Sequence, residues 1–133
     1  MITRFTDLLQ QATEQPNAQR LLFLFAESQV TKKSNKREQK KGTLTPVMCV
    51  DKLPQDLTSF QALVAEADTM SKDWNMVFIA GLNGDGDVPP TTDEAGPYLN
   101  QMTNNLASGQ DLSGYLVFDR AENLIVIEAA GTG

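Results

Sequence analysis

Residues 75–90, NMVFIAGLNGDGDVPP, constrain the fold of this 133-residue chain more than any other stretch. Residues 76–80 form a short, strongly apolar run, which is typical of a strand covered on both faces. Residues 81–90 contain three glycines and two prolines, so no continuous hydrogen-bonded element fits there and a loop is predicted. The sequence therefore predicts a strand at the centre of a sheet that leads directly into a loop.

Helices and strands are predicted along the rest of the chain. Apolar residues at three- and four-residue intervals predict helices, and short runs of apolar and β-branched residues predict strands. Helices are expected over residues 2–14, 57–70 and 91–109, and strands over residues 20–27, 43–51, 73–82, 114–118 and 124–128. The simplest architecture is one α/β or α+β domain over residues 1–133, with a mixed sheet of about five strands and about three packed helices.

The sequence leaves the start of the third helix open. Thr91 and Glu94 have the spacing of a capping box, whereas Gly96 followed by Pro97 suits a start one turn later. The side chains expected on the inner face of this helix are Tyr98 or Leu99, Met102 and Leu106.

Basic residues are concentrated in one connection, predicted over residues 28–42. Within it, residues 32–41 carry six lysines and arginines against one glutamate, a net charge of +5, although the whole chain carries −6. The connection has no apolar periodicity, which favours an exposed loop. Contact with nucleic acid or anionic lipid is the alternative, but the block has no aromatic residue for base stacking and the rest of the chain is acidic. Nucleic acid is therefore not an expected partner.

The absence of histidine and the single cysteine, Cys49, exclude several classes of enzyme. Without histidine, the chain lacks the commonest general base and the commonest transition-metal ligand, so serine triads and papain-like cysteine–histidine pairs are ruled out. One cysteine forms no internal disulfide and no multi-cysteine metal site. Because Cys49 stands between Met48 and Val50, we expect it to be buried and inert in a strand.

The loop after the central strand is the best candidate for a site, because ligands in open sheets tend to bind beyond the carboxyl ends of strands. Asn83, Asp85 and Asp87 alternate there with glycines, and Glu94 is twelfth when Asn83 is counted as first. This spacing imitates a calcium loop, which makes calcium or magnesium the candidate cofactor, but Val88 stands where that loop requires glycine. The alternative is a solvated acidic turn.

A second candidate carboxylate, Asp51, ends the second predicted strand. If the second and third strands were parallel neighbours, Asp51 would face the Asp85 loop, and the clustered carboxylates could hold a metal or carry out acid–base chemistry. The alternative is an aspartate that caps the entry to the following helix. Asp51, Asn83, Asp85 and Asp87 are thus the candidate ligand-binding residues.

Three blocks of the sequence resemble a family of small bacterial proteins of similar length. They are QPNAQRLLFLFAE at residues 15–27, PVMCVDKLPQDLTSFQALVAEAD at 46–68 and DWNMVFIAGLNG at 73–84. Members of this family carry the label ribonucleotide reductase subunit alpha, and the resemblance implies a shared domain. The catalytic subunit of that enzyme uses several cysteines, whereas this chain has only Cys49, so no catalytic residue is carried over.

These patterns favour a binding or accessory protein without catalysis of its own, acting on a protein or a small ligand. An exposed edge strand or the C-terminal hairpin could pair two copies into a homodimer. The alternative is a small metal- or ligand-dependent enzyme that uses Asp51, Asp85 and Asp87.

No apolar run approaches the ~20 residues of a membrane span, and the first residues lack the apolar core of a secretory signal. We therefore expect a cytoplasmic protein, with a flexible tail over residues 129–133.

Overall fold

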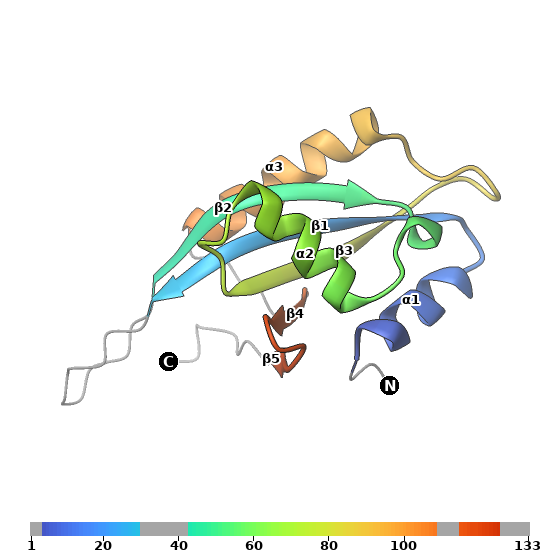
Figure 1. The fold of residues 1–133 in the computed structure, drawn as a ribbon. Coiled ribbons are helices and arrows are strands. Elements are labelled where there is room, and N and C mark those ends of the chain that lie inside the picture. Colours follow the sequence, from blue (N-terminus) through green and yellow to red (C-terminus); the bar gives the residue numbers. More distant parts are fainter. Residues whose placement is uncertain (1–3, 30–42, 109–114, 126–133) are drawn as a thin grey trace, which may run out of the picture.

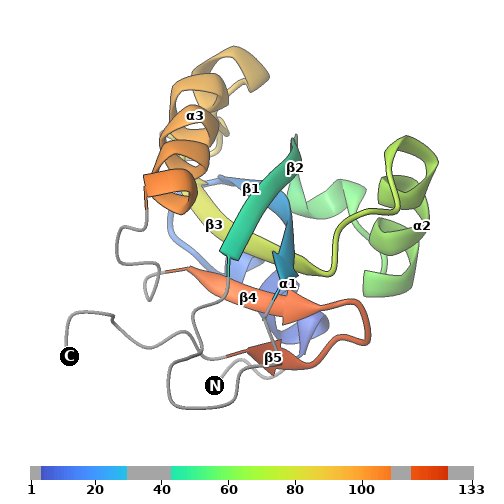
Figure 2. The ribbon, with the colours of Figure 1, turned by 90° about the vertical axis from the view of Figure 1, so that its left-hand side faces the viewer.

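The computed structural model describes residues 4–29, 43–108 and 115–125, which form three layers. A five-stranded sheet lies in the middle, with helices α1 and α2 on one face and helix α3 on the other (Figures 1 and 2). The prediction of one domain with five strands and three helices is confirmed, in its α+β form.

The strands run in the order β2-β1-β3-β4-β5, and each neighbouring pair is antiparallel. The central position of the third strand is therefore confirmed. The second and third strands are not neighbours, because β1 lies between them, so the arrangement that would bring Asp51 alongside the Asp85 loop is absent. The strands are β1 (Gln19–Gln29), β2 (Thr43–Lys52), β3 (Met76–Asn83), β4 (Leu116–Asp119) and β5 (Leu124–Ile125).

The helices are α1 (Phe5–Thr13), α2 (Phe60–Met70) and α3 (Thr92–Ser108), with a short 3₁₀ helix, η1 (Pro54–Asp56), before α2. Helix α2 begins three residues later than predicted, because the Ser59 hydroxyl caps it by accepting a hydrogen bond from the Ala62 amide. No helix in the described ranges is both long enough and apolar enough to cross a membrane.

A capping box decides the start of α3. The Thr91 amide donates to Glu94 Oε1 at 2.8 Å, and the Glu94 amide donates to Thr91 Oγ1 at 3.1 Å. The helix therefore begins at Thr92 rather than near Gly96. Leu99 is buried and Tyr98 is exposed, which settles the inner face together with Met102 and Leu106.

Two predicted boundaries are wrong by a few residues. Ser28 and Gln29 still belong to β1, so the connection begins later than residue 28. Gly81, Leu82 and Asn83 pair with β1 and belong to β3, so the loop begins at Gly84. At Gly81, pairing with β1 outweighs the local preference of glycine for loops. Most of the predicted basic connection and the predicted tail lie outside the described residues.

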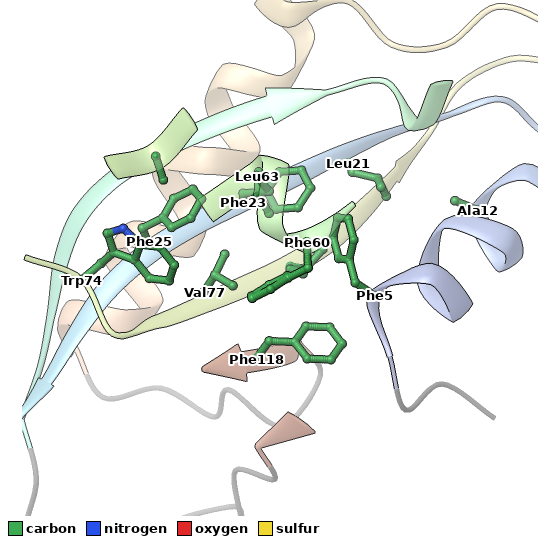
Figure 3. Packing of buried hydrophobic residues seen from close by; sticks show 12 residues of the cluster. Phe5, Ala12, Leu21, Phe23, Phe25, Phe60, Leu63, Trp74, Val77 and Phe118 are labelled. Atoms are coloured by element: carbon green, nitrogen blue, oxygen red, sulfur yellow. The ribbon is translucent and has the colours of Figure 1, made fainter. Parts of the chain in front are cut away.

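An aromatic cluster fills the space between the sheet and helices α1 and α2 (Figure 3). Phe5, from the first residue of α1, is completely buried. Its ring centroid lies 5.6 Å from that of Phe60, 6.4 Å from Phe23 and 6.5 Å from Phe118. One side chain thus joins α1, α2 and two strands of the sheet.

Trp74 closes the other end of the same cluster. Its ring packs edge-on against Phe25 at 4.9 Å, and its Nε1 donates a hydrogen bond to Asp68 at 3.2 Å. The Arg120 guanidinium lies 4.3 Å from the centre of the indole ring and also pairs with Asp68 at 2.7 Å. These contacts tie the end of α2 to the turn after β4.

The opposite face of the sheet packs against α3. Leu22 and Leu24 of β1 and Phe78 of β3 point to this face, whereas their neighbours along each strand point to the aromatic cluster. Because side chains alternate along a strand, both faces of β1 and β3 are buried, which explains their nearly continuous apolar sequences.

The turn between β4 and β5 is tied to α1. Glu122 adopts a positive φ of 67°, and its Oε2 accepts a hydrogen bond from the Phe5 amide at 2.9 Å.

Partial burial acts to raise the pKa of Asp119 in this turn, but hydrogen bonds from Asn123 and from the Ala121 amide outweigh it and lower that pKa below its ordinary value.

Strand β2 is an edge strand of the sheet formed by the described residues. It carries Pro46, which is tolerated there because an edge strand has one side without a partner. The pairing register shifts beside it, since Phe25 faces Met48 and Ala26 faces Pro46, so Val47 is the extra residue of a bulge. A proline and a bulge both discourage the addition of another strand.

Candidate functional site

A groove with a volume of about 460 Å³ opens between the end of β3 and the first turns of α3. The loop after β3, drawn in yellow in Figure 1, reaches past the end of the sheet before the chain enters α3. The groove is lined by Leu82, Asn83, Gly84, Asp85, Val88, Pro89, Pro90, Glu94 and Tyr98. Three of the residues singled out from the sequence, Asn83, Asp85 and Glu94, are among them.

Two exposed apolar side chains flank this groove. Val88 is 66% exposed and Tyr98 is 49% exposed. Among the large hydrophobic residues that the structure describes, only Met70 is comparably exposed, and it lies at the end of α2. Apolar side chains gathered at a concave surface are typical of a place where another molecule binds.

The charge around the groove is strongly negative. Asp85 and Glu94 line it, Asp87 and Asp93 are exposed within two residues of them in the sequence, and the sequence has no lysine or arginine between Lys72 and Arg120. None of these four carboxylates forms an ion pair within the described part of the chain. Such a concentration of one sign attracts cations and repels phosphates and other anions.

Backbone hydrogen bonds hold the loop in a defined shape. The amides of Asp85 and Val88 each donate to the carbonyl of the other, at 2.8 and 2.9 Å, which closes a tight turn. The Gly84 amide donates to the Ala18 carbonyl, and the Ala18 amide donates to the Gly86 carbonyl, both at 2.7 Å. The loop therefore continues the antiparallel pairing of β1 and β3 beyond the strand ends.

Two amide side chains fix the base of the loop. The Gly86 amide donates to Asn17 Oδ1 at 3.1 Å, and Gln19, which is buried, donates from Nε2 to Asn83 Oδ1. The Asn83 oxygen is therefore already engaged within the chain. This hydrogen bond holds the start of the loop against β1.

Asp51 lies in a partly buried ion pair that positions the wall of the groove. Its Oδ2 contacts Arg20 NH1 at 2.6 Å and accepts a hydrogen bond from Thr92 Oγ1 at 2.8 Å, while Arg20 Nε donates to the Pro90 carbonyl at 2.6 Å. The side chains of Arg20 and Asp51 are only 14% and 13% exposed. These contacts fasten the start of α3 to β1 and β2. Asp51 thus neither joins the Asp85 loop nor caps the following helix.

The structure brings two of the three carboxylates of the calcium-loop spacing, Asp85 and Glu94, to the same groove, but not the third. Asp85 lines the groove, whereas Asp87 lines a separate hollow beside Pro54 and Gln55. Glu94 Oε1 is occupied as a helix cap. Among the residues that the structure describes, no three acidic or cysteine side chains lie close enough together to hold a metal ion.

Cys49 is exposed, so the expectation of a buried cysteine is wrong. The physical reason is the position of β2 at the edge of the sheet, which leaves its middle open. Partial burial, followed by the charge of Asp51, raises the pKa of the Cys49 thiol above its ordinary value. The reactive thiolate is therefore disfavoured at neutral pH.

The apolar part of the groove was not predicted from the sequence. Val88 entered that reasoning only as a substitute for glycine, and Tyr98 only as an alternative to Leu99 on the inner face of the third helix. Leu99, Met102 and Leu106 follow helical spacing without Tyr98, so the sequence already indicated that Tyr98 lies outside the core. The long stretch without lysine or arginine was a second signal, because it indicated a negatively charged surface.

No family model, curated protein or solved structure matches the chain. The assignment of a function rests on the groove itself.

We expect Gly84→Ala to lower the free energy of unfolding by about 1–3 kcal/mol. A Cβ at this position would overlap the Val88 carbonyl oxygen and lie 2.7 Å from Pro89 Cα, so backbone atoms of the turn must move. Urea unfolding measures the change. The control is Gly96→Ala, where an added Cβ meets nothing within 4 Å and removal of a helical glycine is expected to stabilise the protein by up to about 1 kcal/mol. Equal effects of the two substitutions would contradict the close turn.

Proposed function

We propose that this chain is a binding protein without catalysis of its own, and that its groove takes a segment of a partner protein with basic side chains next to an apolar one. The observation that carries the proposal is the combination, in one groove, of exposed Val88 and Tyr98 with the carboxylates of Asp85 and Glu94.

The apolar side chains supply part of the binding free energy. Burial of apolar surface contributes roughly 25 cal/mol per Å², so covering Val88 and one face of Tyr98 favours association. The Tyr98 ring also offers its face to an arginine or lysine, an interaction of about 0.5–1 kcal/mol at an exposed site. Tyr98 follows Glu94 by four residues on α3, so both side chains lie on the same side of that helix.

The carboxylates determine which partners are accepted. A basic segment gains from their potential, whereas an acidic peptide, a nucleotide or a nucleic acid is repelled. The groove is small compared with a standard protein interface, which suits recognition of a short segment with modest affinity. The rigid loop and the Arg20–Asp51 ion pair keep the two walls in place before the partner arrives.

The same features support binding rather than catalysis. The chain has no histidine, and the carboxylates nearest the groove are either turned to opposite sides of the loop or used in capping. Asp51 is held by Arg20 and Thr92. The arrangement therefore offers a surface for recognition and no paired acid and base.

Fluorescence anisotropy with short labelled peptides tests the proposal. We expect a Gly–Ser peptide with a central Arg-Leu-Arg to bind, the matching Glu-Leu-Glu peptide not to bind, and the Arg-Ser-Arg peptide to bind more weakly. Val88→Ser and Tyr98→Ser should each weaken binding roughly tenfold, which corresponds to about 1.4 kcal/mol.

Two variants serve as matched controls. Met70→Ser removes a comparably exposed apolar side chain away from the groove. Asp73→Asn removes an exposed carboxylate that does not line the groove, whereas Asp85→Asn removes a carboxylate that does line it. Met70→Ser and Asp73→Asn should leave the affinity unchanged. If they weaken binding as much as Tyr98→Ser and Asp85→Asn, or if the acidic peptide binds as well as the basic one, the proposed function is wrong.

A further inference from the structure

The loop residues that line the groove have no backbone amide left to donate. The Gly84 amide donates to the Ala18 carbonyl, and the amides of Asp85 and Val88 donate to each other's carbonyls. The two prolines that follow also line the groove, and proline has no amide hydrogen. A ligand whose polar atoms are acceptors, such as a phosphate or a carboxylate, therefore finds no amide donor along this wall.

The same wall presents free acceptors. Glu94 accepts the Thr91 amide with Oε1, which leaves Oε2 for a ligand. Among the described residues, the Asp85 carboxylate has no hydrogen-bond or ion-pair partner. A carboxylate oxygen that loses water to a bound ligand must receive a donor from that ligand, because an unpaired charge is costly to desolvate. The groove therefore selects a ligand with positive charge and several N–H donors.

Tyr98 adds an aromatic face next to these acceptors. Its side chain is 49% exposed and follows Glu94 by one turn of α3. A guanidinium is planar and weakly hydrated, so it stacks on such a face more readily than the compact, strongly hydrated ammonium of lysine. Its five donors spread from three nitrogen atoms in one plane, whereas the three donors of an ammonium share one nitrogen atom. A guanidinium can thus stack on a ring and still donate to two separate carboxylates.

We infer that the basic side chain selected by the groove is an arginine, with its guanidinium against the Tyr98 ring and its donors directed to Asp85 and Glu94. This inference rests on the proposed function, since it names the side chain that the same groove recognises. The apolar neighbour of the arginine lies against Val88, which is exposed at the groove. The apolar contact adds affinity, and the geometry of the arginine donors supplies specificity.

Fluorescence anisotropy with four peptides in one Gly–Ser frame tests the inference. The peptides carry Arg-Leu-Arg, Lys-Leu-Lys, or the first sequence with both arginines replaced by asymmetric dimethylarginine or by citrulline. Dimethylarginine keeps the charge and loses donors, whereas citrulline keeps a planar group and loses the charge. We expect Lys-Leu-Lys and the dimethylarginine peptide to bind roughly tenfold more weakly than Arg-Leu-Arg, and the citrulline peptide not to bind.

Substitutions in the groove locate the source of this preference. Tyr98→Leu keeps an apolar side chain and removes the aromatic face, so it should bring the affinities for Arg-Leu-Arg and Lys-Leu-Lys close together, whereas Tyr98→Phe should preserve the difference. Glu94→Gln keeps the oxygen that caps α3 and removes the charge, so it should weaken the binding of Arg-Leu-Arg several-fold.

Matched controls lie outside the groove. Met70→Leu and Asp73→Asn change a comparably exposed apolar side chain and an exposed carboxylate that do not line it. Both variants should show the affinities and the arginine preference of the wild type. Circular dichroism verifies that each variant is folded.

The outcomes separate this inference from the proposed function. The inference is overturned if Lys-Leu-Lys or the dimethylarginine peptide binds as tightly as Arg-Leu-Arg, or if Tyr98→Leu preserves the arginine preference. In each of these cases basic peptides still bind, so the proposed function stands. If none of the four peptides binds, the proposed function and the inference are both wrong.

Discussion

Replacement of Phe5 by alanine is expected to lower the free energy of unfolding by about 3–5 kcal/mol, the range for a buried phenylalanine. Phe5 has no exposed surface, and its ring contacts those of Phe23, Phe60 and Phe118. Since these rings belong to α2, β1 and β4, the cavity left by alanine borders three other elements. Urea unfolding followed by circular dichroism measures the loss.

A second substitution separates this packing from the hydrogen bond at the same residue. The Phe5 amide, which donates to Glu122 Oε2, is retained in Phe5→Ala. Glu122→Gln keeps an acceptor oxygen and removes the charge, so it should cost about 1 kcal/mol or less. A loss below 1 kcal/mol for Phe5→Ala would mean that α1 is not docked on the sheet as the structure shows.

The second large effect is expected from Asp51→Ala, which should cost about 3 kcal/mol because the Arg20 guanidinium, which is mostly shielded from water, is left without its partner. The same change removes the acceptor of the Thr92 hydroxyl, so the start of α3 is held less firmly and the groove should bind the basic peptide more weakly. Thermal or urea unfolding measures the first effect, and anisotropy the second.

The double variant Arg20→Met with Asp51→Leu identifies the cause. Removal of both charges is expected to restore most of the stability, because well-packed apolar residues can replace a buried ion pair at little cost. Glu66→Ala is the matched control, since it breaks the more exposed ion pair with Lys52 and should cost less than about 1 kcal/mol. Equal losses for Asp51→Ala and Glu66→Ala would contradict the special role of the Arg20–Asp51 pair.

The sequence predicts the elements of this fold well, because their signals are local. The apolar run at residues 76–80, the hairpin of the last two strands and the helical spacing of Leu99, Met102 and Leu106 each lie within one segment. The start of α3 was left between two alternatives, and a three-residue capping box decides it. Strand order is different in kind. Nothing in a local pattern states that β1 lies between β2 and β3, and this single fact removes Asp51 from the Asp85 loop.

The structure gives a geometry to the loop that the sequence singled out as the candidate site. The loop after β3 does line a groove, and Asp85 does face it. The carboxylate spacing suggested a metal, but the turn between Asp85 and Val88 directs Asp87 to the other side. The contact between Arg20 and Asp51 joins residues 31 apart in the sequence, so neither residue alone indicates it. Exposure of Val88 and Tyr98 likewise depends on how α3 packs.

The most direct test of the central claim is a two-dimensional ¹H–¹⁵N NMR titration of the protein with the Arg-Leu-Arg peptide at about 150 mM salt, where long-range charge effects are screened. We predict saturable shifts that are largest for the amides of Gly84, Asp85, Val88, Glu94 and Tyr98, with those of Cys49 and Met70 unchanged. No saturable shift at the groove, or larger shifts on another face of the molecule, would contradict the claim that this groove is the binding site.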